Sequence, residues 1–178
     1  KPPKQLSVGL IRGPDESLQW ALQDLDISYT LLKDGQALSD VGLAKFSTLV
    51  LDIRAYHHRG AFLKRNRGSI LAYCKAGGRI VCFYHKPHEW NPTEYKAALS
   101  PFEILVGTQR VCEEHAPVAF VDPKHRVLNY PNRLGSQDFK GWVQERGLNF
   151  PRKWGKEWTP LLRMHDTGEA PLDGSLLY

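Results

Sequence analysis

Two short segments concentrate side chains that could bind a small molecule. Segment 54–59 reads Arg-Ala-Tyr-His-His-Arg, and segment 84–91 reads Tyr-His-Lys-Pro-His-Glu-Trp-Asn. Aromatic faces stack on apolar ring surfaces, and an arginine fork binds an anion through two hydrogen bonds at once. Such a set suits a sugar, a carboxylate or a phosphate, and the predicted ligand-binding residues are Arg12, Arg54, Tyr56, His57, Tyr84, His85, Trp90 and Asn91. The alternative is that these are ordinary loop residues whose rings pack locally.

Cys82 is the residue whose type suggests a nucleophile. Alternate side chains of a strand share a face, so Cys82 would lie inside its strand among apolar neighbours. It lacks the flanking glycines of a tight nucleophile elbow, and burial would raise the pKa of its thiol. We therefore predict that Cys74, Cys82 and Cys112 are small buried apolar residues, not reactive thiols or disulfide partners.

Two other arrangements could carry chemistry. Cys82, His85 and His88 have a three-residue spacing, but a strand that runs into a proline-containing loop does not make three such ligands converge, so we predict no metal and no cofactor. His85 and Glu145 could form the acid–base pair of a hydrolase or sugar-modifying enzyme, which requires both groups to reach one substrate. The alternative places Glu145 beside a local arginine and Trp142 in the core.

Hydrophobic patterns predict the elements that must position these residues. Apolar runs predict four strands, at 6–11, 29–32, 47–53 and 79–84. Apolar residues at helical spacing predict a helix after Asp15, through Leu18, Ala21, Leu22 and Leu25, and another over 61–76, through Leu63, Ile70, Leu71 and Cys74. We expect a helical turn at 40–43, a loop at 54–60 and a helix end at Gly77-Gly78.

This order of strands and helices predicts a parallel sheet covered by helices on both faces. Ligands of such sheets collect outside the carboxyl ends of the strands, where loops 12–15, 54–59 and 84–91 would lie. After Lys86, prolines cut the chain into short pieces, for which we predict strands at 117–121 and 160–164, a helix at 137–146 and a strand from Ser175. We expect residues 1–178 to form a single domain.

Composition narrows the class of protein. The net charge is +5, but the 24 basic residues are scattered among 19 acidic ones, and no nucleic-acid-binding motif accompanies them. No apolar run approaches the roughly 20 residues of a membrane-spanning helix. We therefore predict neither a nucleic-acid partner nor a membrane span. The Pro-rich start and the apolar end suggest a fragment of a longer polypeptide.

Several segments together resemble a known family. The resemblance includes Leu-Ser-Val-Gly-Leu-Ile at 6–11. Its most distinctive pieces are the Ile-Arg-Ala-Tyr loop at 53–56, Trp-Asn-Pro at 90–92 and Trp-Val-Gln-Glu-Arg-Gly at 142–147. Over nearly its whole length the chain resembles the class I glutamine amidotransferase-like domain that bacterial PIG-L/LmbE-type deacetylases carry. The turn at 122–129 also looks like one in the trehalose-utilisation proteins, a related group linked to sugars.

The resemblance implies a flavodoxin-like, three-layer α/β fold and a deacetylase domain upstream in the same polypeptide, as its partner. Zinc would belong to that upstream domain, and related full-length proteins are often exported to the periplasm or beyond. Working amidotransferases place a cysteine on a glycine-flanked elbow, whereas here that position falls near Tyr84 or His85. We therefore expect a pseudoenzyme: a non-catalytic accessory domain that binds saccharide or docks the catalytic module. The alternatives are the His85/Glu145 enzyme and a purely structural interface module.

Overall fold

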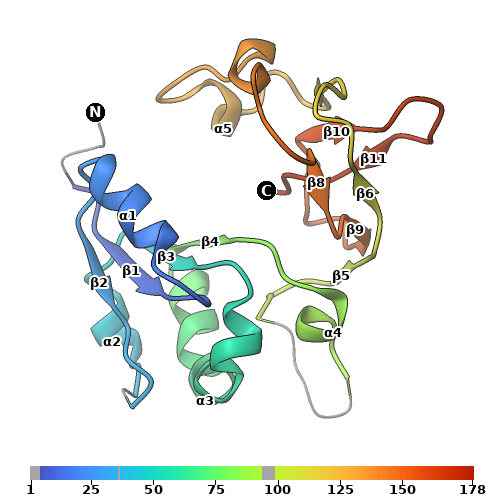
Figure 1. Ribbon diagram of the computed structural model, residues 1–178. Helices are drawn as coiled ribbons and strands as arrows, with labels where there is room; N and C mark the ends of the chain where they lie inside the picture. Colours follow the sequence, from blue (N-terminus) through green and yellow to red (C-terminus); the bar gives the residue numbers. More distant parts are fainter. Residues whose placement is uncertain (1–4, 36, 94–98) are drawn as a thin grey trace. The chain divides into compact units, whose positions relative to one another are not determined.

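The computed structural model describes residues 5–35, 37–93 and 99–178, which gather into two compact units, Lys1–Pro101 and Phe102–Tyr178 (Figure 1). The expectation of a single domain stays a prediction. Within the described residues, no helix is both long and apolar enough to cross a membrane.

The first unit contains a four-stranded parallel sheet. Its strands are β1 (Val8–Ile11), β2 (Tyr29–Leu31), β3 (Thr48–Leu51) and β4 (Arg79–Cys82), in the order β2-β1-β3-β4. All four lie inside the predicted strand segments, and the fold is mixed α/β. The two central strands, β1 and β3, are almost fully buried, as their continuous aliphatic runs require.

Four helices connect or follow these strands: α1 (Ser17–Asp24), α2 (Asp40–Leu43), α3 (Ala55–Lys75) and α4 (Pro87–Trp90) (Figure 1). Leu22 of α1 packs with Val8, Leu10 and Val50 in one buried cluster. The predicted apolar face of α1 is only half right, because Ala21 and Leu25 are exposed. Asp15 does accept a hydrogen bond from the backbone of Ser17, at 2.9 Å, just before the helix.

The predicted loop at 54–60 is wrong, because α3 begins at Ala55 and runs through it. Arg59 interrupts the helix with non-helical angles (φ −132°, ψ 28°). Its guanidinium donates to the Asp34 carboxylate at 2.5 Å and to the Leu32 carbonyl at 2.6 Å. These contacts with a distant loop hold a segment whose own sequence lacks helical periodicity.

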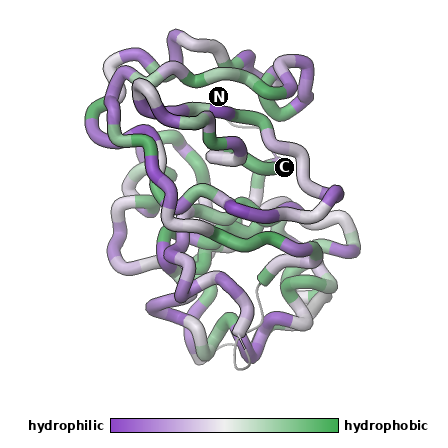
Figure 2. The backbone as a smooth tube through the Cα atoms, turned by 90° about the vertical axis from the view of Figure 1, so that its right-hand side faces the viewer, coloured by the Kyte–Doolittle hydropathy of each residue, from purple (hydrophilic) through white to green (hydrophobic). Residues whose placement is uncertain are grey.

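The second unit is built from short antiparallel pairs. β5 (Ile104–Val106) pairs with β9 (Pro151–Trp154), and β6 (Arg110–Val111) pairs with β8 (Gly147–Leu148). β10 (Leu162–Met164) lies between β7 (Ala119–Phe120) and β11 (Leu172–Asp173), and one short helix, α5, covers Arg126–Asn129. Figure 2 shows hydrophobic and hydrophilic stretches alternating along the backbone. The buried cluster of the second unit is Val111, Ala116, Leu128, Phe150, Leu161, Leu162 and Met164.

Some of the predicted elements of this unit are confirmed and others are wrong. β7 and β10 fall within the predicted strands, whereas the strand expected from Ser175 is reduced to a single bridge between Pro160 and Leu177. The predicted helix at 137–146 is wrong. Only a 3-10 turn, η1 (Ser136–Phe139), forms there, because Gly141 and Gln144 take left-handed angles (φ 70° and 77°) that no α-helix allows.

Candidate functional site

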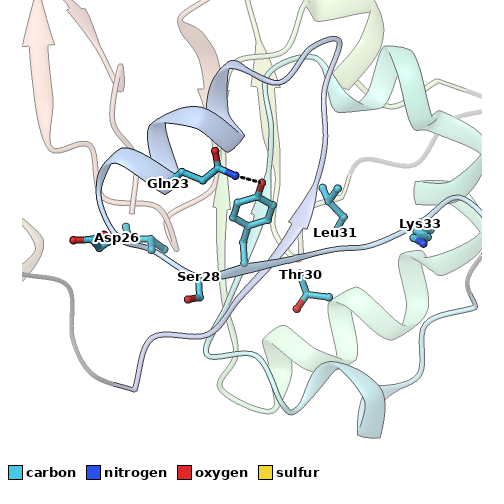
Figure 3. Close-up of a pocket in the computed structure, with 8 residues that line it drawn as sticks. Gln23, Asp26, Ser28, Thr30, Leu31 and Lys33 are labelled. Carbon is cyan, nitrogen blue, oxygen red and sulfur yellow. Dashed lines mark hydrogen bonds between the residues drawn. The ribbon is translucent and has the colours of Figure 1, made fainter.

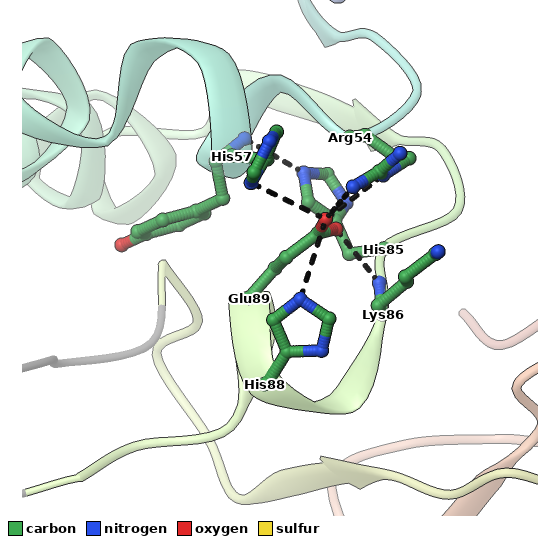
Figure 4. A network of polar contacts seen from close by, with 7 residues as sticks. Arg54, His57, His85, Lys86, His88 and Glu89 are labelled. Atoms are coloured by element: carbon green, nitrogen blue, oxygen red, sulfur yellow. Dashed lines mark hydrogen bonds and ion pairs between the residues drawn. The ribbon is translucent and has the colours of Figure 1, made fainter.

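The candidate site lies at the carboxyl ends of β3 and β4, where the rule for parallel sheets places ligands. Arg54 follows β3 in a left-handed conformation (φ 52°, ψ 23°), which is uncommon for a non-glycine residue. Its backbone N–H donates to the Tyr84 carbonyl at 2.9 Å, so the two predicted ligand loops are joined directly. The backbone geometry thereby points the Arg54 side chain toward the loop that follows β4 (Figure 4).

Asp52 ties the first predicted loop to the same edge. Its buried carboxylate accepts from the backbone N–H of Gly13 at 2.9 Å and from that of Ile53 at 2.7 Å. A Cβ atom at Gly13 would lie 2.1 Å from the Ile53 carbonyl oxygen, so this close approach requires glycine. Arg12, beside it, pairs with Glu16 in an exposed contact of 3.1 Å.

A buried carboxylate, Glu89, is the centre of the site. Glu89 is 2% exposed, and its Oε1 accepts from Arg54 Nε at 2.8 Å and Nη2 at 2.6 Å (Figure 4). Its Oε2 accepts from the backbone N–H of Lys86 at 2.9 Å. Both carboxylate oxygens therefore receive the donors that a buried charge needs in place of water.

Sequence analysis missed Glu89, although a local signal was present. Pro87 and Glu89 occupy the first and third positions of α4, and a glutamate at the third position reaches back to the N–H that precedes the helix in a capping box. This pattern would have placed Glu89 at the start of α4. It could not have revealed Arg54, which lies 35 residues earlier in the chain.

Opposing effects set the protonation of Glu89. Burial raises the pKa of its carboxyl group, but hydrogen bonds from Arg54 and the Lys86 backbone outweigh burial and lower the pKa below its usual value. The same ion pair raises the pKa of Arg54, mainly through the hydrogen bond to Glu89. Glu89 is therefore a carboxylate that holds Arg54, not a general acid at neutral pH.

Two exposed imidazoles point at the same carboxylate oxygen. His57 Nδ1 lies 3.8 Å and His88 Nε2 lies 3.9 Å from Glu89 Oε1, one from α3 and one from α4 (Figure 4). The side chains of His57 and His88 remain largely accessible to solvent. The solvent-facing side of the site thus carries the imidazoles of His57 and His88 and the guanidinium of Arg54, next to the buried Glu89 carboxylate.

His85 is buried, and the backbone occupies both of its ring nitrogens. The N–H of Tyr56 donates to Nε2 at 3.1 Å, and Nδ1 lies 2.8 Å from the Phe83 carbonyl. A backbone N–H can only donate and a carbonyl can only accept, so Nδ1 carries the hydrogen and the ring is neutral. Burial lowers the pKa of His85 and favours the same neutral form.

His85 belongs to a buried aromatic cluster with Tyr56 and Trp90. The His85 ring centroid lies 6.0 Å from that of Tyr56 and 5.4 Å from that of Trp90. Trp90 is 7% exposed and Tyr56 9%, so these two rings pack locally, as in the alternative interpretation of the two segments. As placed, these rings pack against each other, and a ligand role for them stays a prediction, as it does for Tyr84 and Asn91.

The predicted burial of the cysteines is wrong for Cys82 and Cys112, which are exposed, and Cys74 is only partly buried. Cys82 ends β4, an edge strand whose outer side lacks a neighbouring strand in the described sheet. Although its surface is accessible, desolvation raises the pKa of its thiol to about 12. Its Sγ lies 3.8 Å from His85 Nδ1, but that nitrogen donates to Phe83 and offers no lone pair to accept the thiol proton.

The rival pair is divided between the two units. His85 lies in the first unit, and Glu145 is an exposed turn residue of the second. Trp142, predicted in the core as part of the alternative, is exposed. Because the backbone already uses both His85 nitrogens, His85 as placed cannot serve as a general base.

An open groove of about 730 Å³ lies along the outer side of β2 (Figure 3). Its polar lining includes Gln23, whose amide donates to the Tyr29 hydroxyl at 3.4 Å, and Asp26, Ser28 and Thr30. The groove contains none of the predicted ligand residues. Among the described residues, no three His, Cys, Asp or Glu side chains converge as a metal site.

Comparison with known proteins gives limited information. No protein-family model matches the chain, and no curated protein matches it. A crystal structure from Thermoplasma acidophilum, of a protein provisionally assigned to GMP synthase, covers 95% of this chain and 78% of its own, with 11% identity and a TM-score of 0.48. A likeness of this size assigns neither a family nor an activity to the chain.

The Arg54–Glu89 pair generates a stability prediction. Glu89→Gln keeps the shape but removes the charge, so we expect a loss of about 1–2 kcal/mol in the free energy of unfolding, since Arg54 keeps partial contact with solvent. Glu16→Gln, in the exposed pair with Arg12, should change stability by less than about 0.5 kcal/mol. Urea denaturation at pH 7 measures both, and equal effects would contradict the central role of Glu89.

His85 generates a pH prediction. Its folded-state pKa is lowered, so as pH falls below about 6.5 the unfolded chain binds a proton that the folded protein does not, and stability falls by at most about 1.4 kcal/mol per pH unit. His85→Gln should flatten stability between pH 7 and pH 5, measured by urea denaturation. His58→Gln removes an exposed histidine of α3 and is the matched control. An unchanged slope in His85→Gln would show that His85 titrates normally.

Proposed function

We propose that this chain is a non-catalytic accessory domain of a PIG-L/LmbE-type carbohydrate deacetylase, which binds a saccharide or docks the catalytic module. The family part of the proposal rests on the sequence resemblance. The strand order β2-β1-β3-β4 is also the order of the first four strands of a flavodoxin-like sheet, the fold that the resemblance implies. An upstream deacetylase domain would be the partner.

The proposal that the chain is non-catalytic rests on the hydrogen bonding of His85. A thiol enzyme needs an imidazole nitrogen that can accept the thiol proton, and a depressed thiol pKa. The nitrogen that faces Cys82 donates to the Phe83 carbonyl instead, and the pKa of Cys82 is raised. The groups at this edge of the sheet are therefore better suited to binding a molecule than to nucleophilic attack on it.

The proposal that the chain binds a saccharide rests on the solvent-facing groups of the site. His57, His88 and Arg54 present imidazole and guanidinium groups, which donate hydrogen bonds to hydroxyl and carboxylate oxygens. The Glu89 carboxylate neutralises the Arg54 guanidinium. The solvent-facing groups of the site therefore do not carry the excess positive charge that a polyphosphate would require. A hydroxyl-rich or singly charged ligand fits this balance best.

The non-catalytic part is tested by thiol reactivity. We expect iodoacetamide at pH 7.5 to modify Cys82 at least ~10-fold more slowly than Cys112, the other exposed cysteine, because little of the Cys82 thiol is ionised. Peptide mass spectrometry over time measures both rates in one sample. If Cys82 is modified rapidly and His85→Gln abolishes this reactivity, the two residues form a thiol–imidazole pair. That result would contradict the proposal that the chain is non-catalytic.

The binding part is tested by titration. We expect amino-sugar oligomers to shift amide resonances of the full chain in ¹⁵N NMR spectra, with saturation as the oligomer concentration rises. Gluconate and inorganic phosphate serve as controls for hydroxyl-rich and anionic molecules that are not sugar rings. Silence across a broad glycan panel would remove the saccharide part and leave docking of the catalytic module as the proposal.

A further inference from the structure

Trp142 in the second unit is a large aromatic residue held in place at the surface. Although it is 45% exposed, its ring stacks on Phe139, with centroids 5.8 Å apart and planes 12° apart. Phe139 contacts Phe120 at 6.3 Å, and both pack against the buried cluster of this unit. The exposed indole is therefore supported by the core rather than left mobile.

Arg146 fixes the indole from a second side. Its guanidinium lies 5.9 Å from the Trp142 ring centroid, within the range of a cation–π contact. Arg146 Nη1 donates to the Phe139 carbonyl at 2.8 Å, and Nε donates to the Ala116 carbonyl at 3.2 Å. Arg146 therefore contacts both the indole and the backbone of Phe139, the residue on which the indole stacks.

Two acidic residues lie close to the chain segment that carries Trp142. Glu114 Oε1 accepts from the backbone N–H of Gln144, two residues after Trp142 in the sequence, at 2.8 Å. A carboxylate accepts up to about four hydrogen bonds, so Glu114 keeps acceptor capacity beyond this one. Glu145, also exposed, adds a second negative charge next to Gln144.

We propose that these residues, Trp142, Phe139, Arg146, Glu114 and Glu145, form a platform that binds a saccharide ring, with preference for a cationic amino sugar. A rigid exposed indole offers a large contact face at little conformational cost, and the apolar face of a sugar ring matches it. The carboxylates accept hydrogen bonds from hydroxyl groups and attract an ammonium group.

This inference rests on the saccharide part of the proposed function and gives it a location. It does not involve the Arg54–Glu89 edge of the first unit, and the two sites can be removed separately. The matched control for Trp142 is Trp20, which is 60% exposed on α1 of the first unit.

The test titrates the full chain with a glucosamine trimer and an N-acetylglucosamine trimer, using isothermal calorimetry. We expect Trp142→Ala to weaken both by about 10-fold or more, as loss of aromatic stacking does, and Trp20→Ala to change neither by more than about twofold. Trp142→Phe, which keeps a flat ring, should retain most of the affinity. Glu114→Gln should weaken the glucosamine trimer about fivefold and leave the acetylated trimer within about twofold.

The outcomes separate the two claims. Binding by the wild type that survives Trp142→Ala would overturn the platform and leave the saccharide part of the proposed function intact. No binding by the wild type would overturn both. Tighter binding of a single-stranded oligonucleotide than of either trimer, lost in Trp142→Ala, would overturn the saccharide assignment. A circular dichroism melt of each variant confirms that a lost signal comes from the ligand surface and not from unfolding.

Discussion

A carboxylate can leave water only where donors replace its hydration on both oxygens. Glu89 meets this condition at the carboxyl edge of the sheet through Arg54 and the backbone of Lys86. The arrangement also holds Arg54 in a left-handed conformation, which costs about 1–2 kcal/mol for an L-residue. The bond from the Arg54 backbone to the Tyr84 carbonyl and the ion pair with Glu89 together offset that cost.

The geometry around His85 follows from the same constraint. Once β3 leads into α3 through Arg54, the first turn of α3 brings the Tyr56 N–H against His85, which comes from the chain after β4. A neutral ring that accepts from one backbone and donates to another is a structural histidine. At this edge of the sheet the two ring nitrogens of His85 join the start of α3 to the chain after β4.

The sequence predicts what local pattern determines. Continuous aliphatic runs located β1 and β3, because a strand buried on both faces has no other composition available. The start of α3 was missed because residues 55–60 have no apolar period, and contacts from Arg59 to Asp34 and Leu32 hold that turn. Which aromatic rings face inward was equally hidden, since Tyr56 and Trp90 are buried by partners distant in sequence.

Trp90, which was predicted to bind a ligand, is buried, whereas Trp142, which one interpretation placed in the core, is exposed. Trp90 ends a short capped helix and packs against Tyr56 and His85, which come from other segments of the chain. Trp142 follows Gly141, whose left-handed angles are incompatible with the predicted helix, and its side chain is 45% exposed. Ring stacking on a ligand needs an accessible face. Of these two tryptophans only Trp142 is exposed, so the proposed stacking site is in the second unit.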